Sequence, residues 1–292
     1  MKDLKGKTAF ISGGAEGIGF HTARVLGQEG MKVMLADIDA KMLDQAVKTL
    51  KKEGLIVDGT VMDVSLRDGW EAAARKTFET FGNVHFLMGN AGVAVTGAQK
   101  HIEELDWRWI IDVNLMGIVY GCQVFAPHMK AHGQGAHIMN VASMAGLQGV
   151  SYSGPYCATK AAVVSLSEGW RTEFEKDGIE VSVLCPGFVK SRVYDSMRNR
   201  QERYGGPLYH DDLVKEKPAR KMNKDIVVNG IDTDIAARRV LEALLANEFY
   251  VITHPHFRAS QQERARKIDQ AFESAQASPA LKDVPREGFV LK

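Results

Sequence analysis

Tyr156 and Lys160 stand four positions apart in the run SYSGPYCATK, and Ser143 precedes them along the same stretch. A phenol with its ordinary pKa of about 10 is a poor acid or base at neutral pH. Residues four apart share a helix face, so we expect the Lys160 ammonium to lower the pKa of Tyr156 toward the working pH. The pair is therefore a candidate for general acid–base catalysis. The spacing alone also fits an ordinary exposed helical pair.

A second candidate site, for a phosphate-bearing ligand, lies near the N-terminus. The apolar run at residues 8–12 predicts a strand, and the glycine-rich sequence GGAEGIG follows it directly. A helical pattern and a second apolar run, residues 32–36, come next, and Asp37 follows that run. This order of strand, glycine turn, helix, strand and acid is the layout of a dinucleotide-binding unit. The glycines permit a tight turn, and the N–H groups at the helix N-terminus attract a pyrophosphate.

Five further motifs, MDV, GNAG, DVNL, NVAS and PGFV, follow in order along the chain. With the glycine turn and the YCATK run, they make the chain resemble the short-chain dehydrogenase/reductase family over about residues 5–190. Ser12 replaces the Thr of the family's glycine motif and keeps its hydroxyl. Gly89 replaces the first Asn of the family's NNAG and so removes an amide that braces the sheet.

The resemblance implies a doubly wound Rossmann fold and hydride transfer between a nicotinamide and a carbinol or carbonyl carbon. The implied catalytic residues are Asn114, Ser143, Tyr156 and Lys160. Tyr156 would exchange the proton, Ser143 would hold the substrate oxygen, and Asn114 would anchor a water. The implied cofactor-binding residues are Gly13, Glu16, Gly17, Ile18, Gly19, Asp37, Asp63, Val64, Asn90, Ala91, Gly92, Tyr156, Lys160, Pro186, Gly187 and Val189.

Charged residues around the second strand favour NAD over NADP. Asp37 is expected to accept hydrogen bonds from ribose hydroxyls and to repel a 2′-phosphate. Asp39 follows two positions later and Glu16 lies in the glycine loop, whereas an NADP site would offer Arg or Lys there.

Composition predicts a balanced protein without a basic surface. The 292 residues carry a formal net charge of +1, which gives no electrostatic reason to expect nucleic acid or a membrane surface as a partner. The N-terminus MKDLKGK lacks the apolar core of a signal peptide, and we expect no apolar run to approach a membrane span. The three cysteines are predicted to be reduced, buried thiols in a cytoplasmic protein. The histidine pairs 128/132 and 254/256 lack a third ligand at metal spacing, so we expect no metal.

Alternating apolar runs and helical patterns predict a parallel sheet covered on both faces. We expect strands near 8–12, 32–36, 56–61, 84–89, 136–141, 180–185 and 248–252. We expect helices near 17–29, 40–53, 67–81, 103–131, 154–177 and 234–246. One domain, residues 1–255, would include a substrate lid at about 190–233, and residues 256–292 would form a C-terminal extension packed on the domain or on a partner subunit. The family resemblance implies that the two longest helices pack in a homodimer or homotetramer.

The sequence around the catalytic set favours a lipophilic secondary alcohol or its ketone as substrate. Candidate wall residues are Val93, Val95, Leu147, Gln148, Tyr152, Val193, Tyr194, Met197 and Tyr209. The RYGGxxY element and the terminal pattern resemble bacterial dehydrogenases that oxidise the benzylic carbinol of lignin-derived aryl ethers. Two alternatives stay open: a reductase of a steroid or 3-ketoacyl carbonyl, and a non-catalytic NAD-binding regulator.

Overall fold

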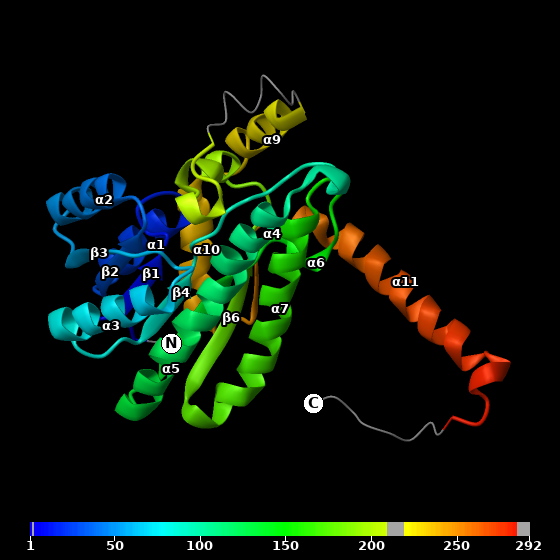
Figure 1. The fold of residues 1–292 in the computed structure, drawn as a ribbon. Coiled ribbons are helices and arrows are strands. Elements are labelled where there is room, and N and C mark those ends of the chain that lie inside the picture. The colour runs from blue at the N-terminus through cyan, green and yellow to red at the C-terminus, as the bar shows by residue number, and fades with distance from the viewer. Residues whose placement is uncertain (2, 209–218, 285–292) are drawn as a thin grey trace. The chain divides into compact units, whose positions relative to one another are not determined.

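A seven-stranded parallel sheet is the centre of the computed structural model, which describes residues 1, 3–208 and 219–284 (Figure 1). The strands are β1 (Thr8–Ser12), β2 (Lys32–Asp37), β3 (Val57–Val61), β4 (Phe86–Gly89), β5 (Ala136–Val141), β6 (Ile179–Cys185) and β7 (Tyr250–Ile252). Their order is β3-β2-β1-β4-β5-β6-β7, and every neighbouring pair is parallel. The doubly wound sheet predicted from the sequence is confirmed.

Helices cover both faces of this sheet. On one face lie α1 (Gly17–Gln28), α2 (Ala40–Lys52) and α10 (Thr233–Ala246), and on the other lie α3 (Arg67–Phe81), α4 (Glu104–Ile111), α5 (Gly117–His132) and α7 (Gly154–Phe174). Successive side chains of a strand point to opposite faces, so the residues of the central strands β1, β4 and β5 are buried under one helix layer or the other. In β1, Phe10 enters one apolar cluster while Ala9 and Ile11 enter the other. This explains the apolar runs without polar alternation.

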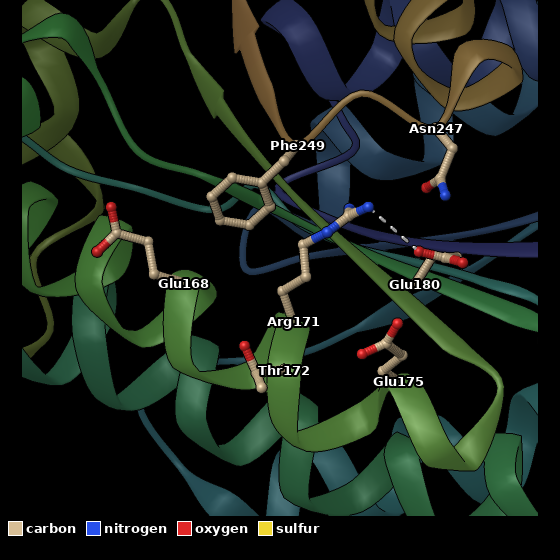
Figure 2. A pocket seen from close by; sticks show the side chains of 7 residues that line it. All are labelled: Glu168, Arg171, Thr172, Glu175, Glu180, Asn247 and Phe249. Carbon is tan, nitrogen blue, oxygen red and sulfur yellow. Dashed lines mark ion pairs between the residues drawn. The ribbon is translucent and has the colours of Figure 1, made fainter. Parts of the chain in front are cut away.

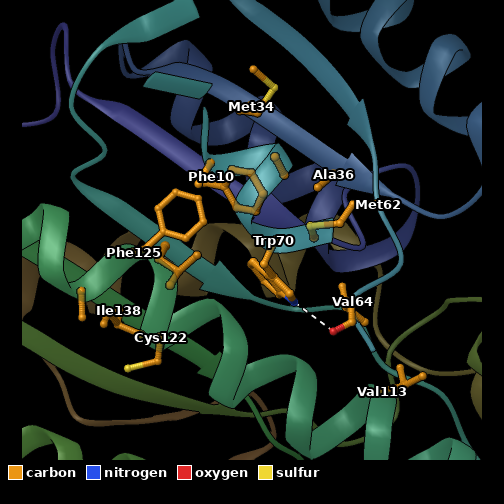
Figure 3. Close-up of a cluster of buried hydrophobic side chains, with 14 of the residues drawn as sticks. Phe10, Met34, Ala36, Met62, Val64, Trp70, Val113, Cys122, Phe125 and Ile138 are labelled. Carbon is orange, nitrogen blue, oxygen red and sulfur yellow. Dashed lines mark hydrogen bonds between the residues drawn. The ribbon is translucent and has the colours of Figure 1, made fainter. Parts of the chain in front are cut away.

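Aromatic side chains fill the cluster beneath α3 and α5 (Figure 3). The ring of Phe10 lies 4.7 Å from that of Phe125 and 5.7 Å from that of Trp70, measured between centroids. Trp70 donates its indole N–H to the backbone oxygen of Val64 at 2.9 Å. That bond ties the chain after β3 to the core, near the carboxyl ends of the strands, where Asp37 and Asp63 lie.

The expected long helix at 103–131 is a continuous helical segment with one irregular turn. A π-helical turn, Asp112–Met116, joins α4 to α5 and contains Asn114. The segment Glu104–His132 is long and apolar enough by composition to cross a membrane, but 56% of its most apolar window is buried inside the protein. The expectation that no apolar run approaches a membrane span is therefore wrong as a statement about composition. The packing of this helical segment against the sheet accounts for its apolar character.

The connection after β6 contains elements that the sequence did not predict. Two 3-10 segments, Val193–Asn199 and Glu202–Tyr204, precede α9 (Ala219–Val228). The short helix α6 (Met144–Leu147) was also not predicted. Tyr209, one of the expected wall residues, lies outside the described residues.

The chain divides into two compact units, Met1–Thr253 and His254–Lys292. The first unit holds the whole sheet. The second contains the 3-10 turn Pro255–Phe257 and continues as α11 (Arg258–Gln276), within the stretch that the sequence predicted as a C-terminal extension.

Candidate active site

The glycine turn after β1 is fixed by side chains at the end of β4. The Ser12 hydroxyl accepts the N–H groups of Asn90 (3.0 Å) and Ala91 (3.2 Å), and the Asn90 amide donates to the oxygens of Ser12 (3.0 Å) and Gly13 (2.8 Å). A Cβ on Gly13 would lie 2.8 Å from the Ala91 Cα, and one on Gly19 would lie 2.4 Å from the Gly13 oxygen. Only glycine fits at either position, so the two strand ends lie close enough to form a backbone cradle.

Glu16, Gly17, Ile18 and Gly19 form the start of α1, as the dinucleotide layout requires. The Glu16 side chain makes no capping hydrogen bond to the helix. The Glu16 side chain therefore does not occupy the first N–H groups of α1, and these groups can bind an anion.

Asp37 lies at the carboxyl end of β2, beside the turn. Its carboxylate accepts the N–H groups of Ala15 at 3.0 Å and Asp39 at 3.1 Å. Burial raises the pKa of Asp37 above its ordinary value, and the two N–H bonds oppose this rise. The side chain is thus oriented by the backbone at the switch point of the sheet, where dinucleotides bind in such folds.

Asp63 and Val64 follow β3 on the next strand outward. The Asp63 carboxylate accepts the N–H and hydroxyl of Ser65 at 3.0 and 2.5 Å. Arginines from the segment after β6 also contact the acids of this region: Arg203 lies 2.7 Å from Asp63, and Arg198 pairs with Glu16. Sequence reasoning missed both arginines, although the density of arginines between positions 192 and 203 was a visible signal.

Ser143 and Tyr156 meet at the carboxyl end of β5. Ser143 begins α6 and accepts the N–H of Ala145 at 3.1 Å, and Pro155 at the start of α7 fixes the approach of the next helix. The Ser143 hydroxyl lies close enough to the Tyr156 phenol to lower the pKa of that phenol. The structure thus brings together two side chains that are separated in the sequence by a loop and a short helix.

Lys160 is buried one turn after Tyr156, with its ammonium 5.7 Å from the centre of the Tyr156 ring. It donates to the backbone oxygen of Val141 at 2.8 Å. A Cβ on Gly92 would lie 3.3 Å from this ammonium and 3.5 Å from the Asn114 side-chain oxygen. Gly92 therefore keeps the space between Lys160 and Asn114 open.

Asn114 is fully buried within the π-helical turn and holds Val93, in the loop that follows β4. Its side chain accepts the Val93 N–H at 2.8 Å and donates to the Val93 oxygen at 2.9 Å. It also donates to the Thr159 hydroxyl at 3.2 Å, and that hydroxyl donates to the backbone oxygen of Tyr156. Thr159 is a third residue that sequence reasoning missed, because nothing in its spacing indicates a link to Asn114.

The expected lowering of the Tyr156 pKa is not what the geometry gives. Burial raises the pKa of the Tyr156 phenol, and the hydrogen bond with Ser143 only partly offsets the rise. Burial also lowers the pKa of Lys160 to about 8. Lys160 is buried and Tyr156 is half-buried, and desolvation disfavours the charged form of each.

The chain after β6, the strand next to β5, runs through Pro186, Gly187 and Val189 at the carboxyl end of the sheet. The Ser143 hydroxyl lies 3.4 Å from the Pro186 oxygen, and the Met144 N–H donates to that oxygen at 2.8 Å. Val189 is buried and forms a parallel bridge with Ile231. The turn thus borders Ser143 directly.

Several residues proposed as substrate walls are instead part of the core. Val95 and Met197 are only 2% and 4% exposed, and both belong to the cluster beneath α3 and α5. Ser196 fixes this part of the chain by hydrogen bonding to Ala94 at 2.9 Å. The side chain of Tyr152 is mostly exposed, Gln148 is exposed and Leu147 is half-buried.

The substitution at Gly89 has a structural reason. A Cβ there would lie 2.4 Å from the Ile118 side chain and 3.1 Å from the Asn140 side-chain oxygen. Asn140 donates from the neighbouring strand β5 to the Ser167 hydroxyl at 3.0 Å. The side chains of Ile118 and Asn140 therefore occupy the space that a larger residue at position 89 would need.

A polar pocket lies far from these residues, between the later turns of α7 and the β6–β7 edge of the sheet (Figure 2). Its lining consists of Glu168, Arg171, Thr172, Glu175, Glu180, Asn247 and Phe249. Arg171 follows Tyr156 by fifteen positions in α7, about 22 Å along the helix axis. The pocket is thus separate from the site at the strand ends.

Of the three cysteines, Cys122 and Cys185 are buried, as expected, and Cys157 is half-exposed. All three are free thiols. Cys157 contacts the Val150 backbone, with 3.3 Å between its sulfur and the Val150 nitrogen.

Comparison with known proteins agrees with this geometry. The family model described as short chain dehydrogenase matches residues 7–202. The chain belongs to the short-chain dehydrogenase family. It is 34% identical to the C alpha-dehydrogenase of Sphingobium sp. strain SYK-6, covering 96% of this chain and 90% of that one. It is 32% identical to the CLA biosynthesis dehydrogenase/reductase of Lactiplantibacillus plantarum, covering 92% and 95%.

The solved structures include a short-chain dehydrogenase/reductase from Burkholderia phymatum in complex with NAD. The two chains align over their full lengths with a TM-score of 0.87 and 33% identity. Membership of the family confirms the predicted Rossmann fold, the oxidoreductase activity on CH–OH groups and the use of a nicotinamide dinucleotide.

Proposed function

We propose that this short-chain dehydrogenase interconverts a lipophilic secondary alcohol and its ketone with NAD, using Ser143, Tyr156, Lys160 and Asn114 as its catalytic set. The observation that carries the proposal is the convergence of three side chains at the end of β5: Ser143 lies beside the half-buried Tyr156 phenol, and the Lys160 ammonium lies 5.7 Å from the centre of the same ring. A hydroxyl, a phenol and a cation at the end of a parallel strand suit proton transfer at a substrate oxygen.

The proton chemistry follows from the environment of each side chain. Tyr156 as phenolate takes the hydroxyl proton in oxidation and returns it in reduction, while Ser143 holds the substrate oxygen by a hydrogen bond. The Lys160 ammonium, with its pKa lowered to about 8, is charged below that pH and favours the phenolate against the cost of burial. Asn114 holds Val93, in the loop after β4, in place by accepting its N–H. When bound, the nicotinamide supplies the hydride acceptor or donor.

The residues at the glycine turn fit a dinucleotide, because any side chain at Gly13 or Gly19 would fill the cradle. The first turn of α1 would bind the pyrophosphate, and Asp37 would bind the ribose hydroxyls. Asp37 ends β2 and Asp39 caps α2, and two carboxylates near the expected ribose would repel a 2′-phosphate, which supports NAD as the cofactor. The relative from Burkholderia phymatum was solved in complex with NAD, which also supports NAD as the cofactor of this chain.

The proposed substrate is a lipophilic carbinol, and a benzylic one is the first to test. The name of the Sphingobium relative, C alpha-dehydrogenase, supports this class, since the chain aligns with 90% of its length. The half-buried Leu147, the last residue of α6, is an apolar residue close to Ser143 in the chain. We further propose a cytoplasmic homodimer or homotetramer, which mass measurement in solution would test.

A substrate panel tests the function directly. NADH formation is followed with NAD+ and with NADP+ over benzylic carbinols, hydroxysteroids, 3-hydroxyacyl thioesters and simple alkanols. We expect turnover of benzylic carbinols with NAD+; turnover confined to steroids or thioesters would move the assignment to the reductase alternative.

Two variants separate the enzyme from a non-catalytic NAD-binding protein. Tyr156→Phe should abolish turnover and leave NADH binding intact, because it removes only the phenolic oxygen. Asp37→Ser should raise the rate with NADP+ relative to NAD+. Full activity in Tyr156→Phe would refute the assigned role of the phenol.

A further inference from the structure

The RYGG element, Arg203 to Gly206, is folded against the residues that follow β3. The Arg203 guanidinium donates to the Asp63 carboxylate at 2.7 Å and contacts the Ser65 hydroxyl at 2.5 Å. These two partners follow β3, whereas Arg203 lies about 140 positions later in the chain. A charge-assisted hydrogen bond of this kind fixes the orientation of the carboxylate as well as its charge.

The order of the strands shows which part of a dinucleotide reaches Asp63. The glycine turn follows β1, Asp37 ends β2, and Asp63 follows β3, and these three strands are neighbours in that order. The Met62 N–H donates to the backbone oxygen of Asp37 at 2.9 Å, so the chain at Asp63 runs beside Asp37. A pyrophosphate at the first turn and a ribose at Asp37 leave the base to extend over β3, about 5 Å further across the sheet.

The element is anchored so that Arg203 cannot drift from this position. The neighbouring Tyr204 is buried and donates its hydroxyl to the Asp112 carboxylate at 2.7 Å. The Arg203 guanidinium lies 4.7 Å from the centre of the Tyr204 ring. Gly205 and Gly206 both have positive φ, which turns the chain sharply after the pair.

A second ion pair holds the same segment from its N-terminal side. Arg200 is 6% exposed and lies 3.0 Å from the Asp106 carboxylate on α4. The segment is thus fixed to α4 through Asp106 and through Asp112 at its end. The guanidinium of Arg203 remains 39% exposed, on the open side of Asp63.

We propose that Arg203 is a positioning residue for the adenosine half of NAD, acting by orienting the Asp63 carboxylate and by covering the base. The inference rests on the proposed function, because it assumes that the groove binds NAD. It assigns the RYGG element to the cofactor, although its resemblance to benzylic alcohol dehydrogenases first associated it with the substrate. A purine stacked on a guanidinium also gains cation–π stabilisation.

Half-ligands test the proposal without turnover. Binding of ADP-ribose, of nicotinamide mononucleotide and of NADH is measured by calorimetry for the wild type, Arg203→Ala and Arg67→Ala. Arg67 is the matched control, since it stands four positions from Asp63 and pairs with the exposed Glu71 at 3.1 Å instead. We expect Arg203→Ala to weaken ADP-ribose and NADH about tenfold, equivalent to about 1.4 kcal/mol, with no change for the mononucleotide.

A double-mutant cycle with Asp63→Asn separates positioning from a general loosening of the segment. If Arg203 acts through Asp63, its replacement should cost much less ADP-ribose affinity in the Asp63→Asn background. Additive losses, equal losses for both half-ligands, or unchanged ADP-ribose binding in Arg203→Ala would each overturn the proposal. Failure of the wild type to bind NADH or ADP-ribose would instead overturn the proposed function itself.

Discussion

Removing the Ser12 hydroxyl should loosen the junction between the glycine turn and β4. This hydroxyl accepts two N–H groups, from Asn90 and Ala91, and lies 3.3 Å from the Met88 oxygen, to which it donates. The side chain of Ser12 is 1% exposed, so water cannot replace it without a shift of the backbone. At about 1 kcal/mol for each hydrogen bond, Ser12→Ala should lower the free energy of unfolding by about 2–3 kcal/mol.

The loss is measurable by thermal unfolding of the purified protein. For a domain of this size, about 1 kcal/mol corresponds to a shift of roughly 2–4 °C, so the Tm should fall by roughly 5–10 °C. Ser12→Thr keeps the hydroxyl and should retain most of the stability. Thr49→Ala removes an exposed hydroxyl that bonds to Gln45 at 2.8 Å within α2, and it should cost under about 0.5 kcal/mol.

Two results would refute this reasoning. If Ser12→Ala unfolds at the wild-type temperature, the three hydrogen bonds do not stabilise the turn. If Ser12→Thr loses as much as Ser12→Ala, packing around the side chain and not the hydroxyl decides the stability.

Three further outcomes follow from buried groups. Because burial raises the pKa of Tyr156, the oxidation rate should increase with pH above neutrality and the reduction rate should decrease. Initial rates in both directions check this, and an oxidation rate that does not change with pH would contradict it. Burial lowers the pKa of His137 from 6.5 to about 3, so the unfolded chain binds a proton there that the folded chain does not. The contribution of His137 to stability is full above about pH 6.5 and is lost as pH falls toward 3; urea midpoints should show a weaker acid dependence in His137→Asn. Gly89→Ala should destabilise by about 1–3 kcal/mol through its clash with Ile118, and Ile118→Val should restore part of this in chemical denaturation.

The sheet and its helices were predictable because local pattern and tertiary burial agree. β1 and β5 have the predicted bounds, and α3 also begins and ends as predicted. Parallel strands buried on both faces leave uninterrupted apolar runs, and the helices between them follow the 3.6-residue period. The family motifs then placed Ser143, Tyr156 and Lys160 at one edge of the sheet.

The parts that sequence missed depend on contacts over long separations. Nothing local to Met197 shows that its side chain enters the core, since Ser196 is tied to Ala94 about a hundred positions earlier. The direction of the Tyr156 pKa shift also depends on burial, which the Tyr–Lys spacing does not report. The π-helical turn at Asn114 leaves the apolar pattern around it unchanged, so the sequence predicted one regular helix.

The π-helical turn makes the aim of Asn114 depend on the length of this helical segment. A π-helical turn closes i→i+5 hydrogen bonds and therefore holds one residue more than an α-helical turn. Deleting one residue between Asp112 and Met116 would let the segment close as a regular α-helix, with the fully buried Trp109 and Ile110 still facing the sheet. The same deletion would shift Asn114 relative to Val93, whose N–H and backbone oxygen it binds. A gap across this turn in an alignment of related chains would therefore mark a change in the site and not in the core.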